Sequence, residues 1–162
     1  MAIAVLLFAA TGMAQKPEWQ KVVSSRGKFS VKMPGKPKIK KDKLDSGVDS
    51  NKYSVNIGDG VCFASYTQME VGNADEQQLA QVGLKAFVDQ LGADLTQADV
   101  WKVGKNKGRM AIMENKEQGL EAYYRVVIVD DIMYQLAIAY GNNTPVDKKI
   151  AKKFLNSFKL SK

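Results

Sequence analysis

Lysine forms the most pronounced pattern of reactive side chains in this sequence. Seven lysines stand between positions 28 and 43 against a single acid, Asp42, and six more lie between positions 148 and 162. Clustered ammonium groups attract lipid headgroups, anionic polymers and acidic proteins. The candidate anion-binding residues are Lys36, Lys38, Lys40, Lys41, Lys148, Lys149, Lys152 and Lys153.

Two interpretations of these lysines stay open. Nucleic-acid sites combine lysine with arginine and exposed aromatic rings, whereas arginine occurs here only at positions 26, 109 and 125. This argues against nucleic acid as a partner. Lysine-only faces also keep proteins soluble and stop sheet edges from pairing with one another. We expect the segment 36–43 to be such a solvated edge, with an anion-binding surface as the alternative.

Catalytic chemistry finds little support in the sequence. The chain contains no histidine, which removes the commonest general base, the usual zinc ligand and the Ser-His and Cys-His nucleophile systems. Neither GxxxxGK[ST] nor GxGxxG occurs, so no nucleotide-binding fingerprint is present. We therefore expect a protein that is not an enzyme, without a metal or cofactor.

The remaining reactive side chains have simpler structural explanations. Asp130 and Asp131 separate two apolar runs, which predicts a hairpin turn, and Asp75 and Glu76 stand at the start of a helical pattern, which predicts a cap. Cys62 lies in the apolar run VCFASY, which predicts a buried small hydrophobic residue.

The N-terminus predicts a signal peptide. An apolar stretch from Ala2 to Ala10 is followed by small residues and by a polar segment that begins at Gln15, as in secretory leaders. The stretch is shorter than the about 20 residues of a transmembrane helix, so no transmembrane span is expected. We predict a leader over residues 1–14 and a periplasmic or secreted protein, with a buried N-terminal strand or helix as the alternative.

The rest of the chain, residues 15–162, is predicted to be a single domain. Its apolar content and its length suffice for a hydrophobic core. Alternating polar and apolar residues predict strands, and the segment 36–47 is expected to be a loop or an irregular edge. The predicted strands are 19–24, 29–33, 53–57, 61–71, 100–104, 109–114, 120–129 and 132–140.

Two amphipathic patterns predict helices. The first covers 75–91 and is capped by Asn73 or Asp75; its expected buried face is Leu79, Val82, Ala86 and Leu91. The second covers 145–158, with Thr144 as the cap and Pro145 at the first helical position. Small residues in the last long strand, among them Ala137 and Ala139, predict a face that a helix covers. The fold class is therefore α+β, with a mainly antiparallel sheet of about six to eight strands.

Two sequence motifs resemble those of a known family. Phe29, Val31 and Pro34 match an "F-x-V-x-x-P" strand, and Phe154, Ser157 and Phe158 match a terminal "F-x-x-S-F" signature. With the aromatic hairpin between them, these motifs resemble the small exported domains related to the photosystem extrinsic protein PsbP and to the DcrB-type envelope proteins. The resemblance implies an extracytoplasmic accessory or protein-binding module, an envelope protein as partner, and Phe154 and Phe158 as core residues.

Overall fold

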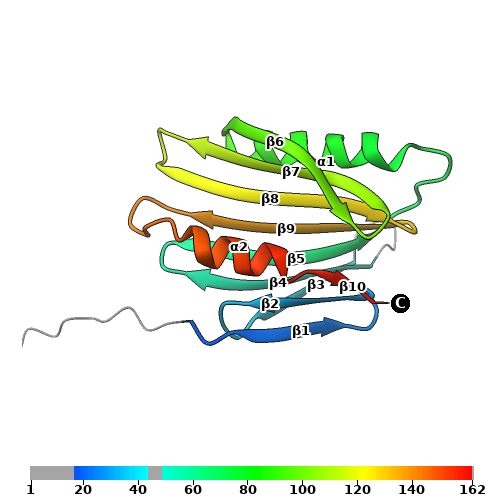
Figure 1. Ribbon diagram of the computed structural model, residues 1–162, viewed down its shortest axis with the longest axis horizontal. Coiled ribbons are helices and arrows are strands. Elements are labelled where there is room, and N and C mark those ends of the chain that lie inside the picture. Colours follow the sequence, from blue (N-terminus) through cyan, green and yellow to red (C-terminus); the bar gives the residue numbers. More distant parts are fainter. Residues whose placement is uncertain (1–16, 44–48, 162) are drawn as a thin grey trace, which may run out of the picture.

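The computed structural model describes residues 17–43 and 49–161, which form two antiparallel sheets and two helices (Figure 1). The larger sheet has seven strands in the order β3-β4-β5-β9-β8-β7-β6, and the smaller has three in the order β1-β2-β10. The α+β class and the antiparallel sheet are confirmed, although three of the strands form a separate sheet.

Nearest-neighbour hairpins build most of the larger sheet. Asp130 and Asp131 both have positive φ, 50° and 60°, and pair Val129 with Ile132, so they form the expected tight turn. The strands are β1 (Gln20–Ser24), β2 (Phe29–Met33), β3 (Lys38–Lys43), β4 (Asp49–Ile57), β5 (Gly60–Gln68), β6 (Asp94–Val103), β7 (Asn106–Asn115), β8 (Leu120–Val129), β9 (Ile132–Tyr140) and β10 (Lys159–Leu160).

The two faces of the larger sheet are covered differently. Helix α1 (Glu76–Leu91) packs on β7 and β8, and the small residues Ala137 and Ala139 belong to its core cluster. The opposite face carries helix α2 (Lys148–Asn156) and the smaller sheet, which enclose the main core. In Figure 1, α2 and β10 lie in front of the lower strands and leave most of β6, β7 and β8 uncovered on that side.

The core around β2 follows the alternation of its sequence. Phe29, Val31 and Met33 are buried, whereas Lys32 is exposed. The Phe29 ring packs edge-on against Tyr134 with 5.9 Å between centroids and stacks on Phe158 at 5.5 Å. Such aromatic pairs stabilise a core beyond the area that they bury.

Helix α1 has the predicted bounds but another buried face. Asp75 is the cap, because its carboxylate accepts hydrogen bonds from the backbone N–H groups of Gln77 and Gln78. Val82, predicted to be buried, is 64% exposed. The buried face is formed by Ala80 and Leu84, with Phe87, Val88 and Leu91 packed beside them. The spacing i, i+4, i+7 from Ala80 follows one side of a 3.6-residue helix, and Val82 lies on the other side.

Helix α2 begins later than the sequence predicted. Asp147, rather than Thr144, caps it by accepting hydrogen bonds from the backbone N–H groups of Lys149 and Ile150. The Thr144 hydroxyl instead accepts a bond from the backbone N–H of Asp59. Phe154 and Phe158 are core residues, as the family resemblance implied, although the helix ends at Asn156.

Two strand predictions are corrected. The segment 36–47, expected to be a loop or an irregular edge, contains the regular strand β3, which pairs with β4 from Lys38 to Lys43. Because β4 offers an unpaired edge, hydrogen bonding overrides the low strand propensity of lysine. Strand β6 starts at Asp94, six residues before the predicted start at Val100, because it pairs with the long strand β7.

The predicted leader, residues 1–14, lies outside the described residues. Among the residues that the structure does describe, no helix is long and apolar enough to cross a membrane. Cys62 is buried as expected, and its burial raises the pKa of the thiol.

Candidate functional site

A cleft of about 720 Å³ opens where β6 and β8 of the larger sheet face the end of α2 and strand β10. We call it the Arg125 cleft. The side chains that characterise it are Trp101, Lys102, Lys105, Arg125, Phe158 and Lys159. Its volume lies within the range of about 300–1,000 Å³ that is usual for ligand sites.

Trp101 forms the floor of the Arg125 cleft. It stands on β6 opposite Gly108 of β7, where a side chain would collide with Val126 and Val127 of β8. The indole is 7% exposed and lies 5.5 Å from the ring of Phe158. An aromatic pair that joins β6 to the C-terminal segment gives the cleft a rigid apolar base.

Arg125 projects from β8 into the cleft and is held by uncharged groups. Its Nη1 donates a hydrogen bond to the carbonyl of Leu155 at 3.0 Å, and its Nη2 donates to Oδ1 of Asn156 at 2.8 Å. The guanidinium carbon lies 5.5 Å from the Trp101 ring, within cation–π range. Burial lowers the pKa of Arg125, because desolvation disfavours the charged form.

The charge of the cleft is uniformly positive. Lys102, Lys105 and Lys159 also line the cleft, and no aspartate or glutamate of the described residues does. Lys105 also borders a neighbouring pocket that Asp75 and Glu76 line, so it lies between the cationic cleft and two carboxylates. The arrangement can hold an anionic group over an aromatic floor. Arginine keeps its proton in proteins, so this site favours binding over proton transfer.

No protein-family model matches the chain, and no curated protein matches it significantly. Among solved structures, the solution structure of cyanobacterial PsbP (CyanoP) from Synechocystis sp. PCC 6803 is similar over 95% of this chain and 98% of that one, with a TM-score of 0.58 at 13% identity. The fold is PsbP-like. A structure from Bacteroides thetaiotaomicron matches 88% of this chain and 48% of its own length, with a TM-score of 0.46 and 15% identity.

The PsbP-like fold confirms the PsbP part of the resemblance. The DcrB part stays a prediction.

The lysines of the first predicted cluster lie along the edge strand β3. Lys38 and Lys40 pair with Ser54 and Lys52, which places them on the sheet face where α1 packs. The Lys52 ammonium itself lies 4.0 Å from the centroid of the Phe63 ring. Lys41 faces the other side, and Lys36 precedes the strand as an exposed residue. The β3 lysines therefore share an edge but not a cavity.

The lysines of the second cluster lie on the outer side of α2. Lys148, Lys149, Lys152 and Lys153 are all exposed, and the Lys153 ammonium lies 4.3 Å from the centroid of the Trp19 ring. Helix α2 packs on the sheet face opposite to the one that carries Lys38 and Lys40. The fold thus does not bring the two clusters together into one surface.

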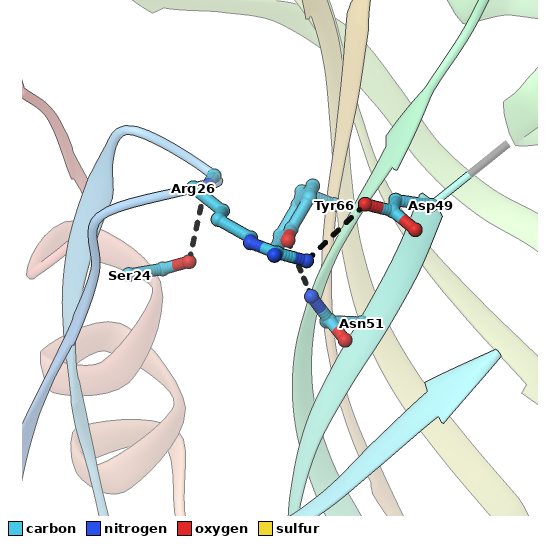
Figure 2. Close-up of polar contacts among 6 residues, drawn as sticks. Ser24, Arg26, Asp49, Asn51 and Tyr66 are labelled. Atoms are coloured by element: carbon cyan, nitrogen blue, oxygen red, sulfur yellow. Dashed lines mark hydrogen bonds and ion pairs between the residues drawn. The ribbon is translucent and has the colours of Figure 1, made fainter. Parts of the chain in front are cut away.

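A third group of polar side chains fastens the first hairpin to the larger sheet. Arg26, in the turn between β1 and β2, forms an ion pair with Asp49 of β4 at 3.4 Å (Figure 2). The Asn51 amide donates to the Tyr66 hydroxyl beneath this pair, and burial raises the pKa of Tyr66. The backbone N–H of Gly27 donates to the Ser24 hydroxyl at 3.0 Å. Because each group is matched within the fold, we assign this cluster a structural role.

None of the eight predicted lysines lines the Arg125 cleft. The signal in the sequence that could have located the cleft is Arg125 itself. It stands between two tyrosines and the apolar run VVIV, in the stretch YYRVVIV. A charged residue at an alternating position shared with Tyr123 and Val127 has to be accommodated inside the fold. This position marks a site more specifically than a run of exposed lysines does.

Proposed function

We propose that this protein is a non-enzymatic accessory module of the cell envelope that binds a partner protein through the Arg125 cleft. The observation that carries the proposal is the guanidinium of Arg125, which is fixed by the neutral oxygens of Leu155 and Asn156 and has no ion pair with a described carboxylate. A partly desolvated cation of this kind gains favourable interactions when an acidic partner arrives.

The chemistry of the lining residues supports protein recognition. Arginine and tryptophan are enriched among the residues that dominate protein–protein affinity. Trp101 and Phe158 supply a fixed apolar surface, and the lysines around Arg125 supply a cationic rim. Rim charges accelerate encounter, while the fixed centre determines how long a complex lasts.

Crosslinking from the cleft tests this function. A photo-reactive amino acid at Lys102, inside the cleft, is compared with one at Lys116, an exposed residue outside it. In native envelopes we expect a defined protein adduct from position 102 only, and we expect Arg125→Gln to remove it. Equal adducts from both positions, or an adduct that survives Arg125→Gln, contradict the proposal.

Arg109→Gln is the matched control for that experiment. Arg109 is also a half-buried arginine whose Nε lacks a partner in the described chain, but it stands on β7 with its side chain on the face of α1. The change removes the same charge from the same sheet outside the cleft. The adduct from position 102 should persist in this variant.

The envelope location rests on the predicted leader over residues 1–14 and on a mature domain 15–162. N-terminal sequencing of the protein purified from its native host should give a start near Gln15, from the periplasmic or extracellular fraction. An intact Met1 in the cytoplasmic fraction contradicts this part of the proposal.

A second candidate function is lysine-mediated binding to anionic lipid or cell-wall polymer. The observation in its favour is that Lys38, Lys40 and Lys52 lie on the same face of β3 and β4. Helix α1 packs on that face of the sheet at β7 and β8 instead. Binding through exposed lysines weakens steeply as salt rises, because separated surface charges are screened within about 8–10 Å at physiological ionic strength. Flotation with anionic vesicles at low and high salt separates this function from binding in the Arg125 cleft.

A further inference from the structure

We infer that the Arg125 cleft takes an extended peptide segment in which a carboxylate stands next to an apolar side chain. This inference rests on the proposed function, since it names the ligand class of the same site. Three features of the cleft carry it: the donors of Arg125, the aromatic floor, and the open strand edges on both sides.

The donors of Arg125 suit a carboxylate. A guanidinium has five N–H groups, and the described residues accept from one on each terminal nitrogen. Each terminal nitrogen therefore retains a second N–H. The two bonds to Leu155 and Asn156 hold the plane of the group, and a planar fork matches the two oxygens of a carboxylate. Asp99 of β6 stands on the same face of the sheet as Arg125, two strands away. Its carboxylate accepts a hydrogen bond from the backbone N–H of Val100 at 2.6 Å.

The floor of the cleft suits an apolar side chain beside that carboxylate. Trp101, Phe158 and Leu160 line it, and the centroid of the Trp101 ring lies 5.5 Å from the guanidinium carbon. A free phosphate or a sugar-phosphate polymer would use the cations and leave this apolar surface in contact with water. A peptide that carries both groups uses the whole site.

The walls of the cleft suit an extended backbone. Among the described strands, β6 is the last of the larger sheet and pairs only with β7, and β10 is the last of the smaller sheet and pairs only with β2. Both contribute lining residues, Trp101 to Val103 from β6 and Lys159 with Leu160 from β10. Open strand edges bind extended segments through main-chain hydrogen bonds.

Short peptides with the intact protein test the inference. The reference is a hexapeptide with both ends blocked and with a central glutamate between leucine and phenylalanine. Two relatives change one feature each, with glutamine in place of the glutamate or serine in place of both apolar residues. A third combines the glutamine with a free C-terminal carboxylate. Inorganic phosphate alone and vesicles with anionic lipid complete the set of probes. Calorimetry or fluorescence anisotropy gives each affinity.

We expect the reference peptide to bind at least about tenfold more tightly than the glutamine and serine peptides, because each loses one group that the cleft recognises. Arg125→Gln should weaken the reference peptide by a similar factor, and Arg109→Gln should leave it within about twofold. If the free C-terminus restores binding to the glutamine peptide, the cleft reads a terminal carboxylate as well as a side-chain one.

Three outcomes overturn the inference. Equal affinity for the glutamate and glutamine peptides would show that the cleft does not recognise a carboxylate. Displacement of the peptide by phosphate or vesicles at comparable concentration would show that the ligand is not a peptide. Arg125-dependent self-association in sedimentation assigns the cleft to a second copy of the chain. If the crosslinked partner still requires Arg125 while the peptides do not discriminate, the ligand class is wrong and the proposed function stands. If the peptides discriminate but the partner does not require Arg125, the proposed function fails alone.

Discussion

The Arg125 cleft and the β3 edge are both cationic, yet they differ in how their charges are held. In the cleft, Arg125 is half-buried, bonded at both terminal nitrogens and placed over Trp101. On the edge, Lys38 and Lys40 stand exposed along β3, which pairs with β4 alone among the described strands. The lysines of the edge are exposed, whereas the central cation of the cleft is half-buried and has fixed partners.

This difference separates specific binding from general attraction. An exposed lysine loses side-chain entropy when it is fixed by a ligand, and exposed ion pairs contribute only about 0–1 kcal/mol. Arg125 is already fixed, so a ligand in the cleft does not have to order it again. The β3 edge can keep the protein soluble or attract an anionic surface, whereas the cleft can distinguish one ligand from another.

The largest effect is expected from Phe154→Ala. The ring is fully buried in α2, whose end supplies Leu155 and Asn156 to the cleft. The cavity should reduce the free energy of unfolding by about 3–5 kcal/mol. Local opening should also increase more in α2, beside the Arg125 cleft, than in β3. Chemical denaturation measures the first effect, and hydrogen exchange of α2 and β3 measures the second.

Val82→Ala provides the control for that variant. It removes an exposed aliphatic side chain from α1, and should change the free energy of unfolding by no more than about 0.5 kcal/mol. A loss below about 1 kcal/mol for Phe154→Ala would contradict the docking of α2 as described.

Most of the fold could be predicted from the sequence because its signals are local. The alternation in β2 placed Phe29, Val31 and Met33 in the core, and the pair Asp130 and Asp131 located a hairpin turn. The buried face of α1 could not be settled in the same way. Val82 is as apolar as the residues that do pack, and only the position of β7 and β8 decides which side of the helix is covered.

The Arg125 cleft could not be predicted because its parts are far apart in the chain. Trp101 comes from β6, Arg125 from β8 and Lys159 from β10, and they meet only when the smaller sheet packs on the larger one. The β3 strand was missed for a related reason. It forms because it pairs with β4, and the low strand propensity of its lysines does not indicate that pairing. The lysine runs were conspicuous in the sequence because they are contiguous.

A smaller effect is expected from high pH, and it concerns the core below the cleft. Burial, together with the charge of Asp130, raises the pKa of Tyr134 to about 12. Its ring lies 5.6 Å from that of Phe158, which lines the cleft. A raised folded-state pKa contributes stability that is complete below the unfolded value of about 10 and is lost as the pH approaches 12.

The free energy of unfolding should therefore fall between pH 10 and pH 12, and it should fall less steeply for Tyr134→Phe. Denaturation at several pH values, with tyrosinate absorbance recorded in parallel, measures both slopes. Identical slopes for the two proteins would show that Tyr134 does not titrate with unfolding.

The smallest effect on stability is expected at the β3 edge, where four lysines are replaced together by glutamine. The variant changes Lys36, Lys38, Lys40 and Lys41. A control removes the same number of charges from sites without an open strand edge, namely Lys116, Lys148, Lys149 and Lys152.

The edge variant should keep its melting temperature and its partner binding nearly unchanged, because exposed substitutions alter stability by no more than about 0.5 kcal/mol. It should nevertheless self-associate more than the control variant, because uncharged strand edges pair with one another and β3 has an open side. Analytical ultracentrifugation over a range of concentrations measures this. An anion-binding surface predicts the reverse, namely a monomer that no longer binds anionic vesicles or cell-wall polymer. Loss of that binding without self-association would give the β3 lysines a ligand and would leave the Arg125 cleft as one of two binding surfaces.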